Sequence, residues 1–236
     1  MKFLQMLLSL FKKKATPAPT AKPVEPPKAQ EPVPPVSTKK KVPTRDEMNL
    51  VVKGFVDGTI PTRVGPYSKI KEIKGKNNRS DQIDSINKAQ GGSLADPYCQ
   101  AGMQETLDEQ CRYYDIDRKK VNIPEGVGTQ DIWRKAPAKY KTNSPQPCMW
   151  VNWKHTDNPG HGHTGLTITG VVKKIFFNTM EFNTTAAGQK VVRDGEGFYY
   201  GLERDLDGYG DAVINGFIDV YAAIVDAMIA SGEYEA

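Results

Sequence analysis

A proline-rich stretch near the N-terminus decides how much of this chain can fold. Residues 15–43 contain nine of the seventeen prolines, mixed with Ala, Lys, Glu and Thr, and they contain no aromatic residue. Such a composition cannot build a hydrophobic core and favours an extended, stiff spacer. The 236-residue sequence therefore predicts three parts: a short segment at 1–14, a linker at 15–43 and one folded domain at 44–236.

The positive charge of the chain belongs to its N-terminal part. The first 43 residues hold nine lysines against two glutamates, whereas the whole chain has a net charge of +4, which leaves −3 for the remainder. The remainder has no stripe of Lys and Arg with interleaved aromatic residues. We therefore expect no nucleic-acid partner.

Segment 1–14, MKFLQMLLSLFKKK, has an apolar run from Phe3 to Phe11 that is followed by Lys12, Lys13 and Lys14. The run is too short to span a bilayer, which takes about 20 residues. Its charges follow the apolar run instead of preceding it, which argues against a cleaved signal peptide. The pattern favours an amphipathic segment that contacts an anionic membrane; a disordered terminus is the alternative, because short isolated helices are marginal.

The first half of the folded domain predicts helices. Ser80 is placed to cap a helix that Gly91 and Gly92 end, and Asp96 is placed to cap a second one with Pro97 at its first position. Residues at helical spacing predict the buried stripe of the second helix: Met103, Leu107, Cys111 and Tyr114.

The second half predicts strands and one final helix. Residues 148–153, 163–172, 174–184 and 197–201 are rich in β-branched and aromatic residues and are separated by turn signals. Residues 211–228 have the spacing of an amphipathic helix that packs on the sheet. The order indicates an α+β fold, with N-terminal helices packed on an antiparallel sheet and a C-terminal helix.

Three cysteines form no CxxC pair and have no zinc-finger histidine spacing, so the sequence predicts neither a disulfide framework nor a structural zinc site. Cys99 falls in the first turn of a predicted helix, where the helix dipole stabilises a thiolate. Cys111 falls on the buried stripe, and Cys148 has no obvious partner. Cys99 is the candidate nucleophile; the alternative is a small buried hydrophobic residue.

A thiolate nucleophile needs a base, and the chain has three histidines: His155, His161 and His163. His161 lies between glycines in a predicted loop, whereas His163 opens a predicted strand. Because rigid elements position catalytic groups better than loops do, His163 is the preferred base and His161 the second choice.

The imidazole also needs a group that fixes its orientation. Glu181 and Asn183 are two residues apart on the next predicted strand and should share one face. A lone strand Glu is commonly a solvent-facing charge. The order of helix-head Cys, strand His and strand Glu-x-Asn favours a catalytic interpretation.

These motifs resemble the CHAP amidohydrolase/peptidase family, papain-like enzymes that cut peptidoglycan and are common in phage endolysins. PYCQAG is similar to its cysteine at a helix start, GHTGL to its Gly-His segment and MEFNT to its Glu-x-Asn strand. NRSDQIDSINKAQGG is similar to the helix and glycine turn before the nucleophile, and VVRDGEGFYYGLER to the closing hairpin. The resemblance covers about residues 77–204.

The resemblance implies a papain-like fold and cleavage of an amide bond in the cell-wall peptide. Cys99 would attack the carbonyl, His163 would act as base and then acid, Glu181 would orient His163, and Asn183 would help to polarise the site. The backbone N–H of Cys99 would form half of the oxyanion hole. No cofactor is implied.

Two features concern metals. Some family members carry an Asp-rich calcium loop before the cysteine, of which only Asp96 remains here, and Tyr98 replaces a frequent Trp. The run DLDGYGD at 205–211 lacks the spacing of an EF-hand, so we expect a turn that caps the last helix. The sequence therefore predicts no metal.

The expected role is that of an endolysin-like enzyme made in the host cytoplasm and acting at the cell wall or periplasm, with membrane-surface association through residues 1–14. Two alternatives keep the enzyme: a secreted antibacterial effector, or a virion component that opens the wall. A third is a non-catalytic wall-binding module of the same fold.

Overall fold

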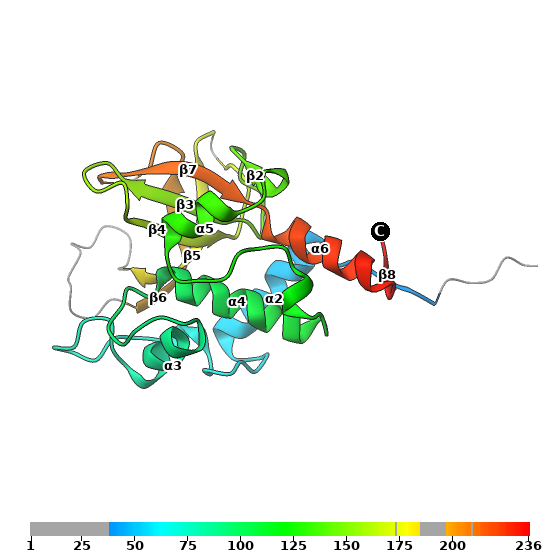
Figure 1. The fold of residues 1–236 in the computed structure, drawn as a ribbon, viewed down its shortest axis with the longest axis horizontal. Coiled ribbons are helices and arrows are strands. Elements are labelled where there is room, and N and C mark those ends of the chain that lie inside the picture. Colours follow the sequence, from blue (N-terminus) through cyan, green and yellow to red (C-terminus); the bar gives the residue numbers. More distant parts are fainter. Residues whose placement is uncertain (1–37, 173, 185–196, 209) are drawn as a thin grey trace, which may run out of the picture. The chain divides into compact units, whose positions relative to one another are not determined.

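The computed structural model describes residues 38–172, 174–184, 197–208 and 210–236, and six antiparallel strands form a sheet at its centre (Figure 1). The strand order is β2-β7-β3-β4-β5-β6. The strands are β2 (Lys141–Thr142), β3 (Trp150–His155), β4 (Gly162–Thr167), β5 (Phe176–Thr184), β6 (Gly197–Asp205) and β7 (Ala212–Ile218).

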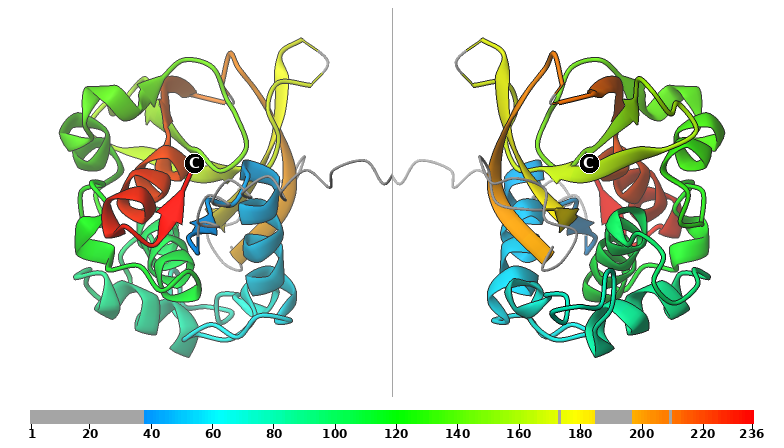
Figure 2. Two further views of the ribbon diagram at one scale, coloured as in Figure 1. Left: turned by 90° about the vertical axis from the view of Figure 1, so that its right-hand side faces the viewer. Right: turned by 90° about the vertical axis from the view of Figure 1, so that its left-hand side faces the viewer.

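Five α-helices lie in the described residues: α2 (Arg45–Asp57), α3 (Asp81–Ala89), α4 (Cys99–Tyr113), α5 (Thr129–Lys135) and α6 (Val220–Ser231). Short 3-10 turns occur at Tyr67–Lys69, Arg118–Lys120 and Ala138–Tyr140. Helix α4 packs against β4 and β5, and α2 and α3 pack against α4 (Figures 1 and 2). The α+β class predicted from the sequence is therefore confirmed.

The compact unit begins earlier than the expected Thr44. It starts at Lys39, and β1 (Lys40–Lys41) pairs in parallel with β8 (Tyr234–Glu235), so the two ends of the unit lie side by side. Thr44 instead begins α2 through a capping box with Glu47. The expectations for residues 1–14 and for 15–37 lie outside the described residues.

Helix α3 follows its sequence signals, and α4 departs from them. Ser80 caps α3 by accepting the N–H of Ile83 at 3.3 Å, as predicted. Asp96 does not cap α4: its carboxylate accepts the N–H of Ser93 at 2.7 Å in the preceding loop. Helix α4 begins at Cys99, and its N-cap residue, Tyr98, makes no side-chain capping bond.

The prediction of one helix over 211–228 was wrong in its first half. Residues Ala212–Ile218 form β7, a central strand between β2 and β3. One reason is the close packing at Gly216, which has a φ of 144°. A Cβ there would lie 2.7 Å from the Trp133 ring and 3.0 Å from a backbone oxygen. Asp219 then caps α6 by accepting the N–H of Ala222, so the 205–211 run is the turn before β7 and does not cap the helix.

The sheet separates two apolar cores. On β3, Trp150 belongs to the larger core and its neighbour Val151 to the smaller one, so the two cores lie on opposite faces. The larger core includes residues of α2, α3, α4 and α6. Gly102 lets α4 approach β5, because a Cβ there would lie 2.3 Å from the Phe182 ring.

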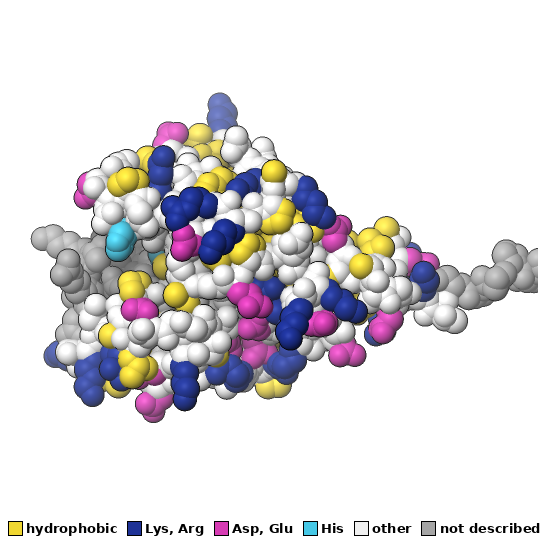
Figure 3. Space-filling view, in the orientation of Figure 1, with side chains coloured by type: hydrophobic (Ala, Val, Ile, Leu, Met, Phe, Trp, Pro, Cys, Tyr) yellow, Lys and Arg dark blue, Asp and Glu magenta, His cyan; other side chains and the backbone are white. Residues whose placement is uncertain are grey.

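Two arginines on the helical side form ion pairs with acidic residues of α4. Arg63 contacts Glu105 at 2.7 Å, and Arg118 contacts Asp108 at 3.1 Å; the two acidic residues are on α4. Figure 3 shows acidic side chains gathered near the centre of this face with Lys and Arg side chains around them.

Candidate active site

The Cys99 thiol lies at the first residue of α4 and is nearly buried, with 5% of the residue exposed. Because Tyr98 provides no side-chain cap, the backbone N–H groups of the first turn are left to interact with an anion at this position. The hydroxyl of Thr129, the first residue of α5, lies 3.8 Å from the sulfur. The sulfur is thus surrounded by hydrogen-bond donors.

His163 and Glu181 meet across two neighbouring strands. Strand β4 pairs with β5 so that Gly165 lies opposite Glu181, and the His163 Nε2 lies 2.9 Å from the Glu181 Oε2. A Cβ at Gly165 would lie 2.7 Å from the Glu181 Cγ, too close for two carbon atoms. Gly165, the second glycine of the GHTGL segment, therefore makes room for the Glu181 side chain, whose carboxylate contacts His163.

The same histidine lies close enough to Cys99 for each group to shift the pKa of the other. Since Nε2 faces Glu181, Nδ1 is the ring nitrogen left for the sulfur. The structure thus brings together three of the predicted site residues in the order Cys99, His163, Glu181. In this order the carboxylate fixes the ring orientation while the ring exchanges a proton with the thiol.

The electrostatics favour a charged pair at Cys99 and His163. Burial raises the pKa of a thiol, but the hydrogen bond and charge of His163, together with Thr129, lower the pKa of Cys99 below its ordinary value. Burial works to lower the pKa of His163, yet its contacts with Cys99 and Glu181 raise that pKa to about 9. A thiolate beside an imidazolium is the resting form that these shifts support.

Arg204 completes the chain of charges, and sequence reasoning did not assign it a role. Its Nε donates to the Glu181 Oε1 at 2.7 Å and its Nη2 to Oε2 at 2.5 Å, while the Thr179 hydroxyl also donates to Oε1 at 2.5 Å. Burial alone would raise the pKa of Glu181, but Arg204 and His163 lower it to about 2. Glu181 is therefore a fully buried carboxylate that stays ionised.

Trp153 covers the imidazole and the guanidinium. Its ring stacks on His163 with centroids 5.6 Å apart and an interplanar angle of 26°, and the Arg204 guanidinium lies 6.0 Å from the same ring. Trp153 is fully buried. An apolar cover excludes water and strengthens the hydrogen bonds of the site.

Amide side chains hold Thr129 next to the sulfur. Asn152 Nδ2 donates to the Thr129 carbonyl at 3.0 Å, Asn215 Nδ2 donates to Asn152 Oδ1 at 2.8 Å, and Gln130 Nε2 donates to the Trp153 carbonyl at 2.7 Å. The N-terminus of α5 is thereby fixed to β3 and β7. The position of the Thr129 hydroxyl follows from this network.

Two predicted residues are not joined to this chain. Asn183 has φ 54° and lies where the β5–β6 register shifts, so strict alternation with Glu181 is broken. Its buried Oδ1 has no hydrogen-bond partner among the described residues. His161 lies exposed in the β3–β4 turn, where its backbone oxygen accepts the N–H of His155.

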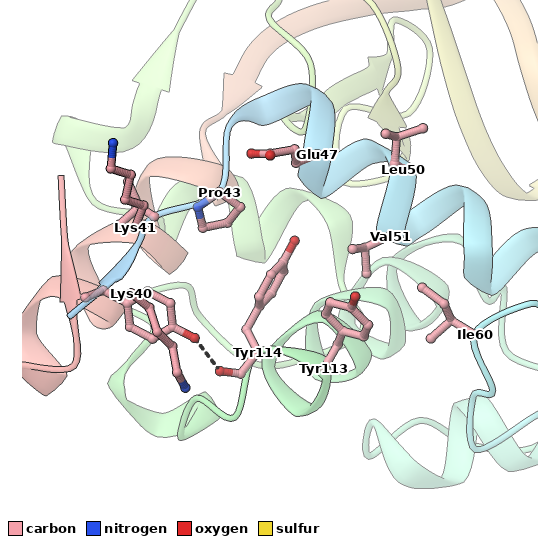
Figure 4. A pocket seen from close by; sticks show the side chains of 11 residues that line it. Lys40, Lys41, Pro43, Glu47, Leu50, Val51, Ile60, Tyr113 and Tyr114 are labelled. Atoms are coloured by element: carbon pink, nitrogen blue, oxygen red, sulfur yellow. Dashed lines mark hydrogen bonds between the residues drawn. The ribbon is translucent and has the colours of Figure 1, made fainter. Parts of the chain in front are cut away.

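One groove in the described part of the chain lies away from this site. It has a volume of about 530 Å³ and is lined by Tyr113, Tyr114 and Tyr234 together with residues of β1 and α2 (Figure 4). Tyr113 is the last residue of α4, and Cys99 is the first, so about 20 Å of helix separate the groove from the sulfur.

Comparisons with protein-family models, with curated proteins and with solved structures gave no match. Within the described ranges, no helix is long and apolar enough to cross a membrane. His155, Asp157 and Asp211 form the one group of described residues whose donor atoms lie close enough to share a metal ion. The functional assignment therefore depends on the geometry around Cys99.

Proposed function

We propose that this protein is a cysteine amidohydrolase or endopeptidase of the CHAP type, with a papain-like fold, that cuts an amide bond in the peptide part of bacterial peptidoglycan. The single observation that carries the proposal is the placement of His163 between Cys99, whose pKa it lowers, and Glu181, which it contacts at 2.9 Å. The peptidoglycan substrate comes from the resemblance of the segments around these residues to that family.

The reaction uses two proton transfers by the same imidazole. The Cys99 thiolate attacks the amide carbon, and the developing oxyanion accepts a hydrogen bond from the N–H at the start of α4. The His163 imidazolium gives its proton to the leaving amine as the C–N bond breaks, which leaves a thioester on Cys99. His163 then takes a proton from water, the hydroxide attacks the thioester, and the carboxylic acid product leaves as the thiolate and imidazolium form again.

Glu181 and Arg204 act by position and charge. An ionised Glu181 stabilises the imidazolium and holds Nδ1 toward the sulfur, and Arg204 lowers the pKa of Glu181 so that it is ionised at neutral pH. The alternative of a wall-binding module without catalysis has no use for a lowered thiol pKa or for a buried carboxylate held by three side chains.

The test is digestion of purified peptidoglycan by the full chain, followed by mass analysis of the released muropeptides. Wild type and Cys111→Ser should release the same fragments, and their masses identify the bond that is cut. Cys99→Ser should release none while keeping its thermal unfolding temperature. Equal release by Cys99→Ser, or release by wild type that persists after complete thiol alkylation, would remove the cysteine mechanism.

The expected membrane contact of residues 1–14 is a separate proposal. Deleting these residues should weaken binding of the protein to anionic vesicles and leave hydrolysis of isolated peptidoglycan unchanged. Unchanged vesicle binding by the deletion variant would contradict the membrane role without affecting the proposed enzymatic activity.

A further inference from the structure

A second cluster of chemically active side chains lies where the β3–β4 turn meets the start of β7. His155 is the last residue of β3, Asp157 follows in the turn, and Asp211 directly precedes β7. Two backbone hydrogen bonds fix these segments: the Thr156 N–H donates to the Asp211 carbonyl at 2.9 Å, and the His155 N–H donates to the His161 carbonyl at 3.2 Å. The backbone thus holds the three side chains together before any ion binds.

The donor atoms of the three side chains converge. One ring nitrogen and one oxygen from each carboxylate all lie within 4.8 Å of one another, and His155 Nδ1 lies 3.2 Å from Asp211 Oδ2. The side chains of His155 and Asp211 are 33% and 54% exposed, so a hydrated ion can reach them. Small rotations of such exposed side chains bring all three to metal-ligand distances.

The charge balance of the cluster favours a cation. Two carboxylates share one imidazole, and neither Asp157 nor Asp211 forms an ion pair with Lys or Arg in the part of the chain that the structure describes. The cluster therefore carries negative charge unless a cation neutralises it.

We propose that His155, Asp157 and Asp211 bind a divalent transition-metal ion of the zinc class, with water in the remaining position. One imidazole nitrogen and two carboxylate oxygens match the N/O ligand set of Zn²⁺, which commonly takes three protein ligands and a water molecule. Ca²⁺ prefers six to eight oxygen ligands and no imidazole, so it fits this site less well. The site is independent of the proposed function, since it contains no residue of the Cys99 chain.

An ion at this position would cross-link the β3–β4 turn to β7. His161 in this turn lies two residues before His163, the candidate base on β4. The metal would therefore hold in place the β3–β4 hairpin that carries His163. Because the ion binds only the folded chain with this geometry, the unfolding temperature should rise as the concentration of free ion increases.

The test is a calorimetric titration of the metal-free full chain with ZnCl₂. The background is Cys99→Ser, so that the thiol of the candidate active site cannot take up zinc. We expect one ion per chain, an accompanying rise in unfolding temperature, and much weaker binding of CaCl₂. Asp157→Asn should weaken zinc binding at least tenfold, because it removes one charged ligand.

Asp207→Asn is the matched control, because it removes the same charge from the turn that precedes β7 without altering the three ligands. It should bind zinc as the background protein does. Circular dichroism checks that each variant is folded. Equal zinc affinity for the Asp157→Asn and Asp207→Asn proteins, or no saturable binding by the background protein, would overturn the proposal.

Discussion

Two cysteines on helix α4 have the same burial and opposite chemistry. Cys99 begins the helix and Cys111 lies twelve residues later, about 18 Å along its axis; both are buried and free. Burial raises the pKa of Cys111 to about 12, whereas the pKa of Cys99 is lowered despite its burial. The difference comes from what faces each sulfur: apolar core at Cys111, and His163 with Thr129 at Cys99.

Cys148 strengthens this comparison. Burial raises the pKa of its thiol as well, and the sulfur donates a hydrogen bond to Asn49 Oδ1 at 2.8 Å. Burial without a facing imidazole therefore raises the thiol pKa at both Cys111 and Cys148. Cys99 differs in lying at the start of a helix and beside an imidazole that is itself held by a buried carboxylate.

The largest effect should separate the two cysteines of α4. Cys99→Ser should lower the rate of peptidoglycan hydrolysis by about 10⁴-fold or more, because the nucleophile is lost. Cys111→Ser should leave the rate within about twofold. Release of soluble muropeptides per unit time is the measurement, and a similar loss in both variants would mean that Cys99 is not special.

Glu181→Gln should have the second-largest effect, and it should lower both the rate of hydrolysis and the stability of the fold. The neutral amide no longer stabilises the imidazolium and removes the carboxylate charge that the Arg204 guanidinium contacts. We expect a loss of about 10³-fold in hydrolysis and a loss of about 3–5 kcal/mol in the free energy of unfolding. Rates and urea unfolding curves test the two effects; full stability in the variant would contradict the buried ion pair.

Arg204→Met should shift the acid sensitivity of the fold. The pKa of Glu181 is about 2 in the folded protein against about 4.5 in the unfolded chain. Its ionised contacts therefore stabilise the fold above pH 4.5, and this contribution is lost as the pH falls toward 2. Without Arg204 that loss should begin at a higher pH, with Arg204→Lys in between because it keeps the charge but not the paired hydrogen bonds. Identical acid-unfolding midpoints would exclude this role.

The smallest effect concerns Thr129. Thr129→Val removes the hydroxyl at 3.8 Å from the sulfur and should lower the rate of hydrolysis by a few fold, roughly 1 kcal/mol in the barrier. Thr129→Ser keeps the hydroxyl and should retain the wild-type rate. If the Val and Ser variants are equally active, the hydroxyl does not assist the thiolate.

The sequence allowed the candidate Cys, His and Glu to be predicted because each lies at a position that local signals reveal. Cys99 follows a loop into a helix, His163 opens a strand, and Glu181 lies on the next strand, so a simple hairpin brings the last two together. Helix α3 was predictable for the same reason, since Ser80 and two glycines mark its ends.

The parts that were missed depend on contacts between distant residues. Arg204 reaches Glu181 across the β5–β6 pair, and no spacing in the sequence reveals that contact. The apolar residues from Val213 to Met228 fit helical spacing, but a tightly packed Gly216 and the cap at Asp219 divide them into a strand and a helix. Asn183 lies at a bulge that alternation cannot anticipate.

The metal ligands are a further example of distant residues brought together. His155 and Asp157 are separated by more than fifty residues from Asp211, and the two segments meet only because β7 pairs with β3. The 205–211 run therefore gives no metal signal by itself.

The most direct test of the account is the pH dependence of the alkylation rate of each cysteine. Iodoacetamide is the alkylating reagent, and mass spectrometry measures the extent of modification at each site. We predict that Cys99 is alkylated well below the ordinary thiol pKa while Cys111 and Cys148 stay unmodified, and that His163→Ala removes this advantage. Alkylation of Cys99 only at alkaline pH, or the same profile in His163→Ala, would contradict a thiolate activated by His163.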